Sequence, residues 1–212
     1  MNATPGKTPV GCLYIDTITP GKDAASGLPL FLGLPGIGTR PFRCLDGKKL
    51  WDGLQTALLA SRSRCETVAI AARGTGCAAA LALAEQLPVD RLVLVEPKLS
   101  LRGLQREGSK ADADRVASSR QARRIMAYAR RNLSLCVSDV LLIESGNGDR
   151  AFPDAALSVH GTVRHLFVDG KTRRDLYTIR ENAVKPAISW FLHTGELPKP
   201  LAENPEMCII NG

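Results

Sequence analysis

Long apolar runs are the first feature that this chain of 212 residues lacks. Its one long run of small residues, Ala78 to Ala84, is much shorter than the roughly 20 apolar residues that cross a bilayer. The chain also opens without the charged and apolar regions of a secretory signal. We therefore expect a cytoplasmic protein without a membrane span. Its length is sufficient for one domain with a sizeable buried core.

Cysteine spacings typical of metal or redox sites are missing as well. The six cysteines are scattered along the chain, and we interpret them as mostly buried, reduced thiols rather than as a disulfide framework. Cys208 is the fifth residue from the end, which does not fit a prenylation box. The glycine-rich stretch Gly33 to Gly38 is followed by Thr39-Arg40, so it lacks the lysine of a nucleotide-binding Walker loop. We expect no metal and no cofactor.

Aromatic residues make up only 5% of the chain, and they are scarce where the positive charge is concentrated. The segment from Lys98 to Arg131 holds ten basic and three acidic residues, so it carries the entire net charge of +7. Tyr128 is its only aromatic residue, whereas single-stranded nucleic acids are bound by basic residues interleaved with aromatics. The pattern argues against nucleic acid as a partner. It leaves a solvated helix face or a site for a small anionic ligand or protein partner, with candidate residues Arg120, Arg123 and Arg124.

Strand-like and helix-like segments alternate along the chain. We expect strands at Val10–Ile18, Leu28–Leu34, Thr67–Ala71, Arg91–Pro97, Asp139–Glu144 and Val163–Val168, and helices at Lys48–Arg62, Gly76–Gln86, Asp112–Arg131 and Ile179–His193. The alternation predicts an α/β fold in which a mainly parallel sheet of about six strands lies between two helical layers. We place a single domain at 10–195, with a flexible N-terminus at 1–9 and a tail at 196–212.

The most informative segment runs from Thr67 to Ala84 and consists of a strand, a sharp turn and a helix of small residues. This is the architecture of a nucleophile elbow, in which a strained turn lifts a hydroxyl or a thiol into a cleft. The residue at the centre of the turn is Gly74. Glycine adopts such a turn but supplies no nucleophile.

Five fragments, in the right order, resemble the α/β-hydrolase superfamily over roughly residues 10–195. GLPGIG is similar to the turn DxPGxG, with Gly33 in place of the aspartate. AARGTGCAAALALA is similar to the elbow GxSxGGxxALxLA, and RLVLVEP to the strand that follows it. LLIESGNGDRAFP is similar to the acid turn, with Asp149 at the acid position, and LFVDGKTRRDL to the loop that carries the histidine.

The resemblance implies a catalytic triad of which only the acid remains. A triad needs a hydroxyl that attacks, a histidine that takes its proton and an acid that orients the histidine. The three positions here are Gly74, Asp149 and Arg174, the last beside Arg173. The resemblance also places the basic segment, at 98–132, where the family inserts lids. Candidate ligand-binding residues are Asp16 and Thr17, in place of the oxyanion-loop His-Gly, and Thr75, whose backbone N–H is positioned to bind an anion.

Two side chains stay open as nucleophiles. A register shift of one residue puts Thr75 at the apex of the turn. Cys77 follows on the first turn of the helix, where the helix dipole would stabilise a thiolate, although we favour a small buried residue there. We interpret all three histidines as structural or surface residues, because none follows the acid turn at the expected place; they are His160, His165 and His193.

The sequence therefore favours a catalytically degenerate α/β-hydrolase-like protein over an enzyme, one that binds a ligand or protein through the old cleft and the arginine-rich lid. The alternative is an active hydrolase or acyl-transfer enzyme on ester or thioester substrates, with Thr75 or Cys77 as a relocated nucleophile.

Overall fold

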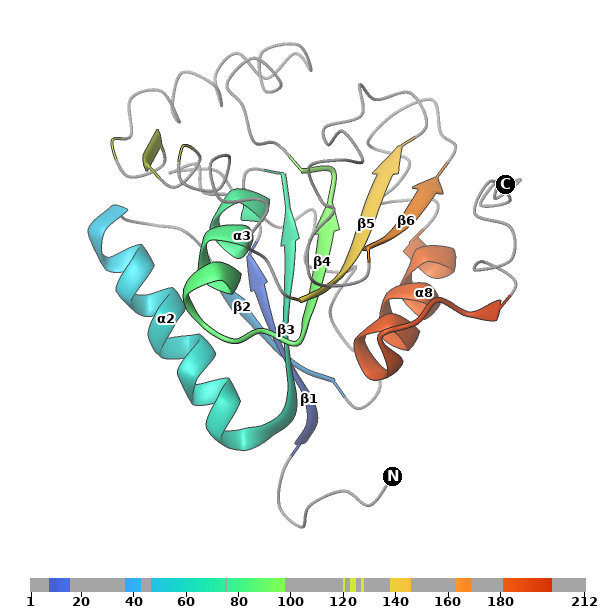
Figure 1. Ribbon diagram of the computed structural model, residues 1–212, viewed down its shortest axis with the longest axis horizontal. Coiled ribbons are helices and arrows are strands. Elements are labelled where there is room, and N and C mark those ends of the chain that lie inside the picture. Colours follow the sequence, from blue (N-terminus) through green and yellow to red (C-terminus); the bar gives the residue numbers. More distant parts are fainter. Residues whose placement is uncertain are drawn as a thin grey trace.

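A single parallel sheet forms the centre of the molecule. The computed structural model describes residues 8–15, 37–42, 47–74, 76–97, 120, 123, 124, 127, 138–145, 163–168 and 181–199. Its strands are β1 (Thr8–Ile15), β2 (Ile37–Phe42), β3 (Cys65–Arg73), β4 (Arg91–Val95), β5 (Asp139–Ser145) and β6 (Val163–Val168). They lie in the order β2-β1-β3-β4-β5-β6, and every neighbouring pair is parallel. The predicted fold class is confirmed (Figure 1).

The strand β2 was not predicted from the sequence. Ile37 and Gly38, expected in a turn, are the first residues of β2 and pair with Val10 and Gly11 of β1. β2 is the edge strand of the sheet, and an edge position tolerates the missing N–H of Pro41. The expected strand at Leu28–Leu34 lies outside the described residues.

Alternation along the strands gives the sheet two apolar faces. In β3, Val68, Ile70 and Ala72 belong to one buried cluster, whereas Ala69 and Ala71 belong to another. The same division of odd and even residues holds in the neighbouring strands β1, β4 and β5. Because both faces are apolar, the strands appear in the sequence as nearly continuous hydrophobic runs.

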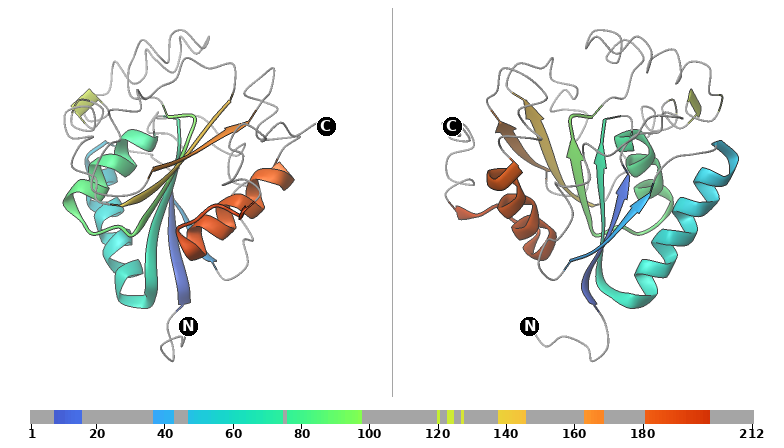
Figure 2. Two further views of the ribbon diagram at one scale, coloured as in Figure 1. Left: turned by 45° about the vertical axis from the view of Figure 1, so that its right-hand side comes forward. Right: turned by 180° about the vertical axis from the view of Figure 1, so that it is seen from behind.

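Helices cover both faces, as expected for this pattern. The helices α2 (Gly47–Arg64) and α3 (Gly76–Gln86) contribute to the first cluster, and α8 (Glu181–Thr194) contributes to the second. Figure 2 shows the sheet between these two layers. Every residue of α3 from Gly76 to Ala84 is buried, which fits its small side chains, since they allow the helix to pack closely on the sheet.

The C-terminal end of α8 is closed by a left-handed glycine. Gly195 has a φ of 77°, and its N–H donates to the carbonyl oxygen of Phe191 at 2.7 Å. This is a common helix cap that glycine adopts without a steric penalty. The Arg91 guanidinium on β4 donates to the carbonyl oxygen of Leu192, so the same helix end is tied to the sheet.

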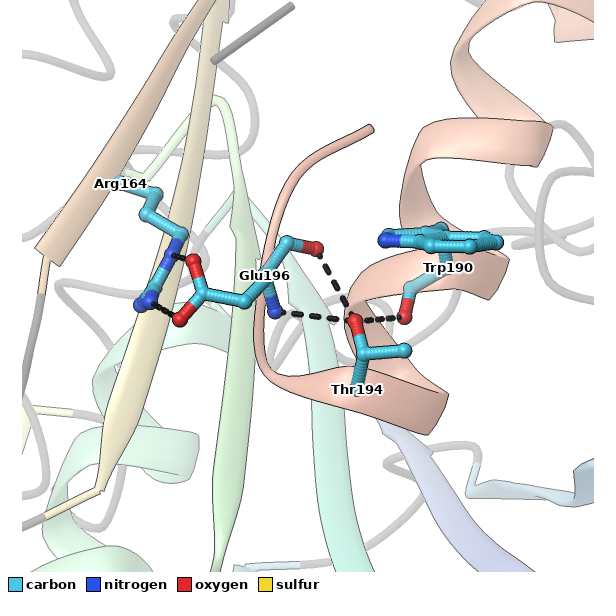
Figure 3. A network of polar contacts seen from close by, with 4 residues as sticks. All are labelled: Arg164, Trp190, Thr194 and Glu196. Carbon is cyan, nitrogen blue, oxygen red and sulfur yellow. Dashed lines mark hydrogen bonds and ion pairs between the residues drawn. The ribbon is translucent and has the colours of Figure 1, made fainter. Parts of the chain in front are cut away.

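A polar network then joins this helix end to the edge strand β6 (Figure 3). The Thr194 hydroxyl donates to the carbonyl oxygen of Trp190 at 2.8 Å and accepts the N–H of Glu196 at 3.1 Å. The Glu196 carboxylate forms an ion pair with Arg164 of β6, including a bond from Nε to Oε2 of 3.0 Å. The hydrogen bond from Arg164 lowers the pKa of Glu196 below its usual value.

Residues close to both predicted domain limits belong to described elements or to the core. β1 begins at Thr8, and Leu197 is a buried member of the core cluster under α8. The division of the chain into N-terminus, domain, lid and tail stays a prediction. Among the helices that the structure describes, none is both long and apolar enough to cross a membrane.

Gly195→Ala should destabilise the protein. Alanine at position 195 would be strained at the positive φ, and its Cβ would lie 3.2 Å from Oδ2 of Asp139. We therefore expect a loss of about 1–2 kcal/mol in the free energy of unfolding. Urea titration measures this free energy. Gly53→Ala, inside α2, is the control and should increase stability by up to about 1 kcal/mol, because alanine favours a helix. Equal stability of Gly195→Ala and the parent protein would contradict the role of Gly195 as the cap of α8.

Candidate functional site

The strand order marks one end of the sheet as the place for a ligand. The chain passes from β1 to β2 on one side and then crosses to β3 on the other side of β1. In open parallel sheets, ligands bind beyond the carboxyl ends of the strands at such a switch point. The carboxyl ends of β1 and β3 meet here, since Ile15 pairs with Ala72. The turn at Gly74 follows directly.

Gly74 forms a tight turn between β3 and α3. It is buried and has a φ of 55°, in the left-handed region that favours glycine. Its N–H donates to the carbonyl oxygen of Val95 at 3.0 Å, and its own carbonyl accepts the N–H of Cys77 at 3.3 Å. The strained strand-to-helix turn expected of an elbow is therefore present, and the residue in it has no side chain.

Cys77 lies close to this turn but is fully buried. Its Sγ lies 3.7 Å from the carbonyl oxygen of Val95, the same oxygen that accepts the Gly74 N–H. A thiol in this position packs as a small apolar residue, which is the interpretation that the sequence favoured. In β1, burial raises the pKa of the Cys12 thiol to about 12, and a hydrogen bond with the Ala71 backbone only partly opposes the rise.

Five predicted site residues lie outside the described residues: Asp16, Thr17, Thr75, Asp149 and Arg174. Asp16 and Thr17 directly follow the last residue of β1, and Thr75 separates Gly74 from the first residue of α3. Their assignments stay predictions. The three candidate arginines of the basic segment are exposed: Arg120, Arg123 and Arg124.

A carboxylate–histidine pair, not predicted from the sequence, joins β5 and β6. Nε2 of His165 lies 2.8 Å from Oε2 of Glu144. The pair is far from the elbow, because β4 and β5 lie between β3 and β6. Three strand spacings amount to about 14 Å, more than a histidine side chain can span. His165 is therefore not positioned to serve as the base for a nucleophile at Gly74 or Cys77.

Glu96 is a second polar residue that sequence reasoning missed. It directly follows β4, is only 4% exposed, and has a φ of 48°, the one positive φ among the described residues other than glycine. Its N–H donates to the carbonyl oxygen of Ile143 at 2.9 Å, which places it beside Glu144 at the carboxyl ends of β4 and β5. For Glu144, the alternation of side chains along β5 predicts that it lies on the same face as Leu142. The pairing register of β5 with β6, which brings His165 to that face, cannot be derived from the sequence.

The side chains in the described part of the chain give no arrangement of three or more His, Cys, Asp and Glu residues suited to a metal ion.

No protein-family model and no curated protein matches this chain. Several solved structures match it. One comes from the work on LipS and LipT, two metagenome-derived lipolytic enzymes; it is 14% identical, with a TM-score of 0.69 over 90% of this chain and 99% of that one. Carboxyl esterase 2 from the fungus Tuber melanosporum is 9% identical, with a TM-score of 0.64 over 92% and 79% of the two chains.

A soluble variant of monoglyceride lipase from Saccharomyces cerevisiae is 11% identical, with a TM-score of 0.60 over 93% of this chain and 90% of that one. Another match is an α/β hydrolase from Sphaerobacter thermophilus, at 15% identity and a TM-score of 0.51 over 87% and 93% of the two chains. At such identities the likeness shows the fold and nothing about the reaction. The chain has the α/β-hydrolase fold.

Two of the three buried thiols in the described part of the chain, those of Cys12 and Cys77, should resist alkylation. Iodoacetamide at pH 8 should leave Cys12 and Cys77 unmodified in the native protein, because both are buried and the Cys12 thiol has a pKa of about 12. Peptide mass spectrometry measures the modification, and the same reaction in urea should label both. Rapid labelling of Cys77 in the native protein would contradict its burial and would favour it as a nucleophile.

Proposed function

We propose that this protein is a catalytically degenerate α/β hydrolase that acts in the cytoplasm by binding a ligand or a protein partner without acyl transfer. Gly74 is the observation on which the proposal rests. It lies in a left-handed turn after the strand next to the switch point, where a nucleophilic side chain would have to be. A turn of that geometry is retained, but the group that would attack a substrate is missing.

The surroundings of Gly74 support this proposal. The nearest thiol, Cys77, is fully buried, and its Sγ is close to a backbone carbonyl. His165, which pairs with Glu144, lies on β6, about three strand spacings or roughly 14 Å from β3. A hydrolase site works as a unit, and loss of its nucleophile and of its base each removes most of the rate. Binding is then the function that the same cleft can retain.

The exposed arginines suggest how such a ligand is attracted. Arg120, Arg123 and Arg124 are exposed members of the basic segment, which carries the whole net charge of the chain. A concentrated positive charge raises the local concentration of an anionic ligand or partner surface. We propose that this segment acts as the lid of the binding site.

One observation favours the second candidate function. The solved structures with this fold are described as esterases and lipases, so an active ester or thioester hydrolase with Thr75 or Cys77 as nucleophile remains the competing proposal.

Ester hydrolysis separates the two candidates. We expect the parent protein, Thr75→Ala and Cys77→Ala to hydrolyse p-nitrophenyl butyrate no faster than a heat-denatured sample does. Gly74→Ser should also stay inactive, because a hydroxyl alone lacks a base, and it should lose about 1–2 kcal/mol of stability at a positive φ. Activity of the parent protein that disappears in Thr75→Ala or Cys77→Ala, with folding unchanged by circular dichroism, would establish the competing proposal.

A further inference from the structure

Three arginines of the basic segment lie together on one exposed helical face. Arg120, Arg123 and Arg124 are helical and exposed, and so is Ala127. Their spacing places all four on the same side of an α-helix, because residues three and four apart are neighbours there. We call these four residues the arginine face. None of its guanidinium groups has an ion pair or a hydrogen bond with any residue that the structure describes.

Two arginines elsewhere in the molecule are neutralised by carboxylates of the same chain. Arg62 forms an ion pair with Asp90, with 2.6 Å between Nη1 and Oδ2. Arg164 forms an ion pair with Glu196. The arginine face has no such carboxylate among the described residues, so its charge is available to a partner.

The stability of the isolated chain does not account for this arrangement. Like charges at spacings i, i+3 and i, i+4 repel one another on a helix. Arg120 has a like charge at both spacings, in Arg123 and in Arg124. Carboxylates from outside the chain would remove this repulsion and would accept hydrogen bonds from the guanidinium groups.

The surroundings of the arginine face favour a protein surface as its ligand. In Figures 1 and 2 this helical piece, in yellow-green, lies toward the end of the sheet at which the strand arrows point, on the side of α2 and α3. Small ligands bind in pockets that cover most of their surface, whereas these arginines are exposed. A lipid surface is bound by large apolar side chains together with basic ones, but Ala127 is the one apolar residue of this face.

We propose that the arginine face docks an acidic helix of a protein partner, with carboxylates at i, i+3 and i+4 opposite the three guanidinium groups. Residues three or four apart on any helix have Cβ atoms about 5–6 Å apart, so the two helices present their charges at the same interval. Ala127 has a small side chain, which allows the helices to come close. The inference rests on the proposed binding function and deepens it by naming the partner class.

Two alanine-based helical peptides of equal charge test the inference. One carries its glutamates at i, i+3 and i+4 on a single face, and the other distributes the same glutamates around the helix. The peptides are matched in helicity by circular dichroism. Fluorescence anisotropy with the full chain at about 50 mM salt gives their dissociation constants. We expect the one-faced peptide to bind about fivefold more tightly, the effect of two additional weak ion pairs.

Two double variants distinguish the arginine face from the net charge of the chain. Arg120→Gln/Arg124→Gln should lower the affinity for the one-faced peptide about fivefold. Arg64→Gln/Lys199→Gln removes the same charge from exposed positions elsewhere and should change that affinity by less than about twofold. All four side chains are exposed, so circular dichroism should show an unchanged fold in both variants.

A carboxylate placed within the arginine face should compete with the partner. In Ala127→Glu the new side chain lies four residues from Arg123 and three from Arg124, so it can pair with either. We expect the affinity for the one-faced peptide to decrease about fivefold although every arginine is retained. Ala127→Gln has a side chain of the same size without the charge, and it should retain the affinity.

The outcomes separate this inference from the proposed function. Equal affinity for the two peptides, an equal loss in the two double variants, or an unchanged affinity in Ala127→Glu overturns the inference. It is also overturned if the one-faced peptide does not bind at millimolar concentration, or if phosphatidylserine vesicles or single-stranded DNA bind these arginines more tightly. The proposed function is decided separately, by ester hydrolysis that depends on Thr75 or Cys77.

Discussion

The carbonyl oxygen of Val95 is the atom on which the rest of the site depends. It accepts the N–H of Gly74 at 3.0 Å, and the Sγ of Cys77 lies 3.7 Å from it. One acceptor at the end of β4 therefore holds the turn after β3 and the first turn of α3. The Cys77 thiol beside this oxygen is fully buried, so the turn does not expose it as a nucleophile.

The sheet provides the frame for this contact. Its two apolar faces are covered by α2 and α3 on one side and by α8 on the other. Polar side chains are rare in such an interior, because a buried polar group costs free energy unless it is paired. Glu96 and Glu144 are nevertheless buried there, next to one another at the carboxyl ends of β4 and β5. These two residues thus lie at the end of the sheet where the strand order places a ligand, one and two strands away from β3.

Most of the frame could be predicted from the sequence, and the part that could not has a physical reason. The periodicity of 76–86 and 163–168 gave the bounds of α3 and β6 as the structure has them, because those segments have clear local patterns. β2 was not predicted, since Gly38 and Pro41 are typical of turns, and the edge position is what lets Pro41 lie in a strand. The glycine at the turn was predicted from local sequence alone. The pair Glu144–His165 was not, because it depends on the register of two strands 21 residues apart in the chain.

The absence of an acyl-enzyme at the elbow is the central claim, and peptide mass spectrometry tests it most directly. The native protein would be incubated with a fluorophosphonate probe and, separately, with p-nitrophenyl acetate, and peptides that cover residues 67–86 would then be sequenced. The account predicts an unmodified mass for these peptides with both reagents. A phosphonyl or acetyl adduct on Thr75 or Cys77 that forms in the native protein and not after denaturation would contradict it.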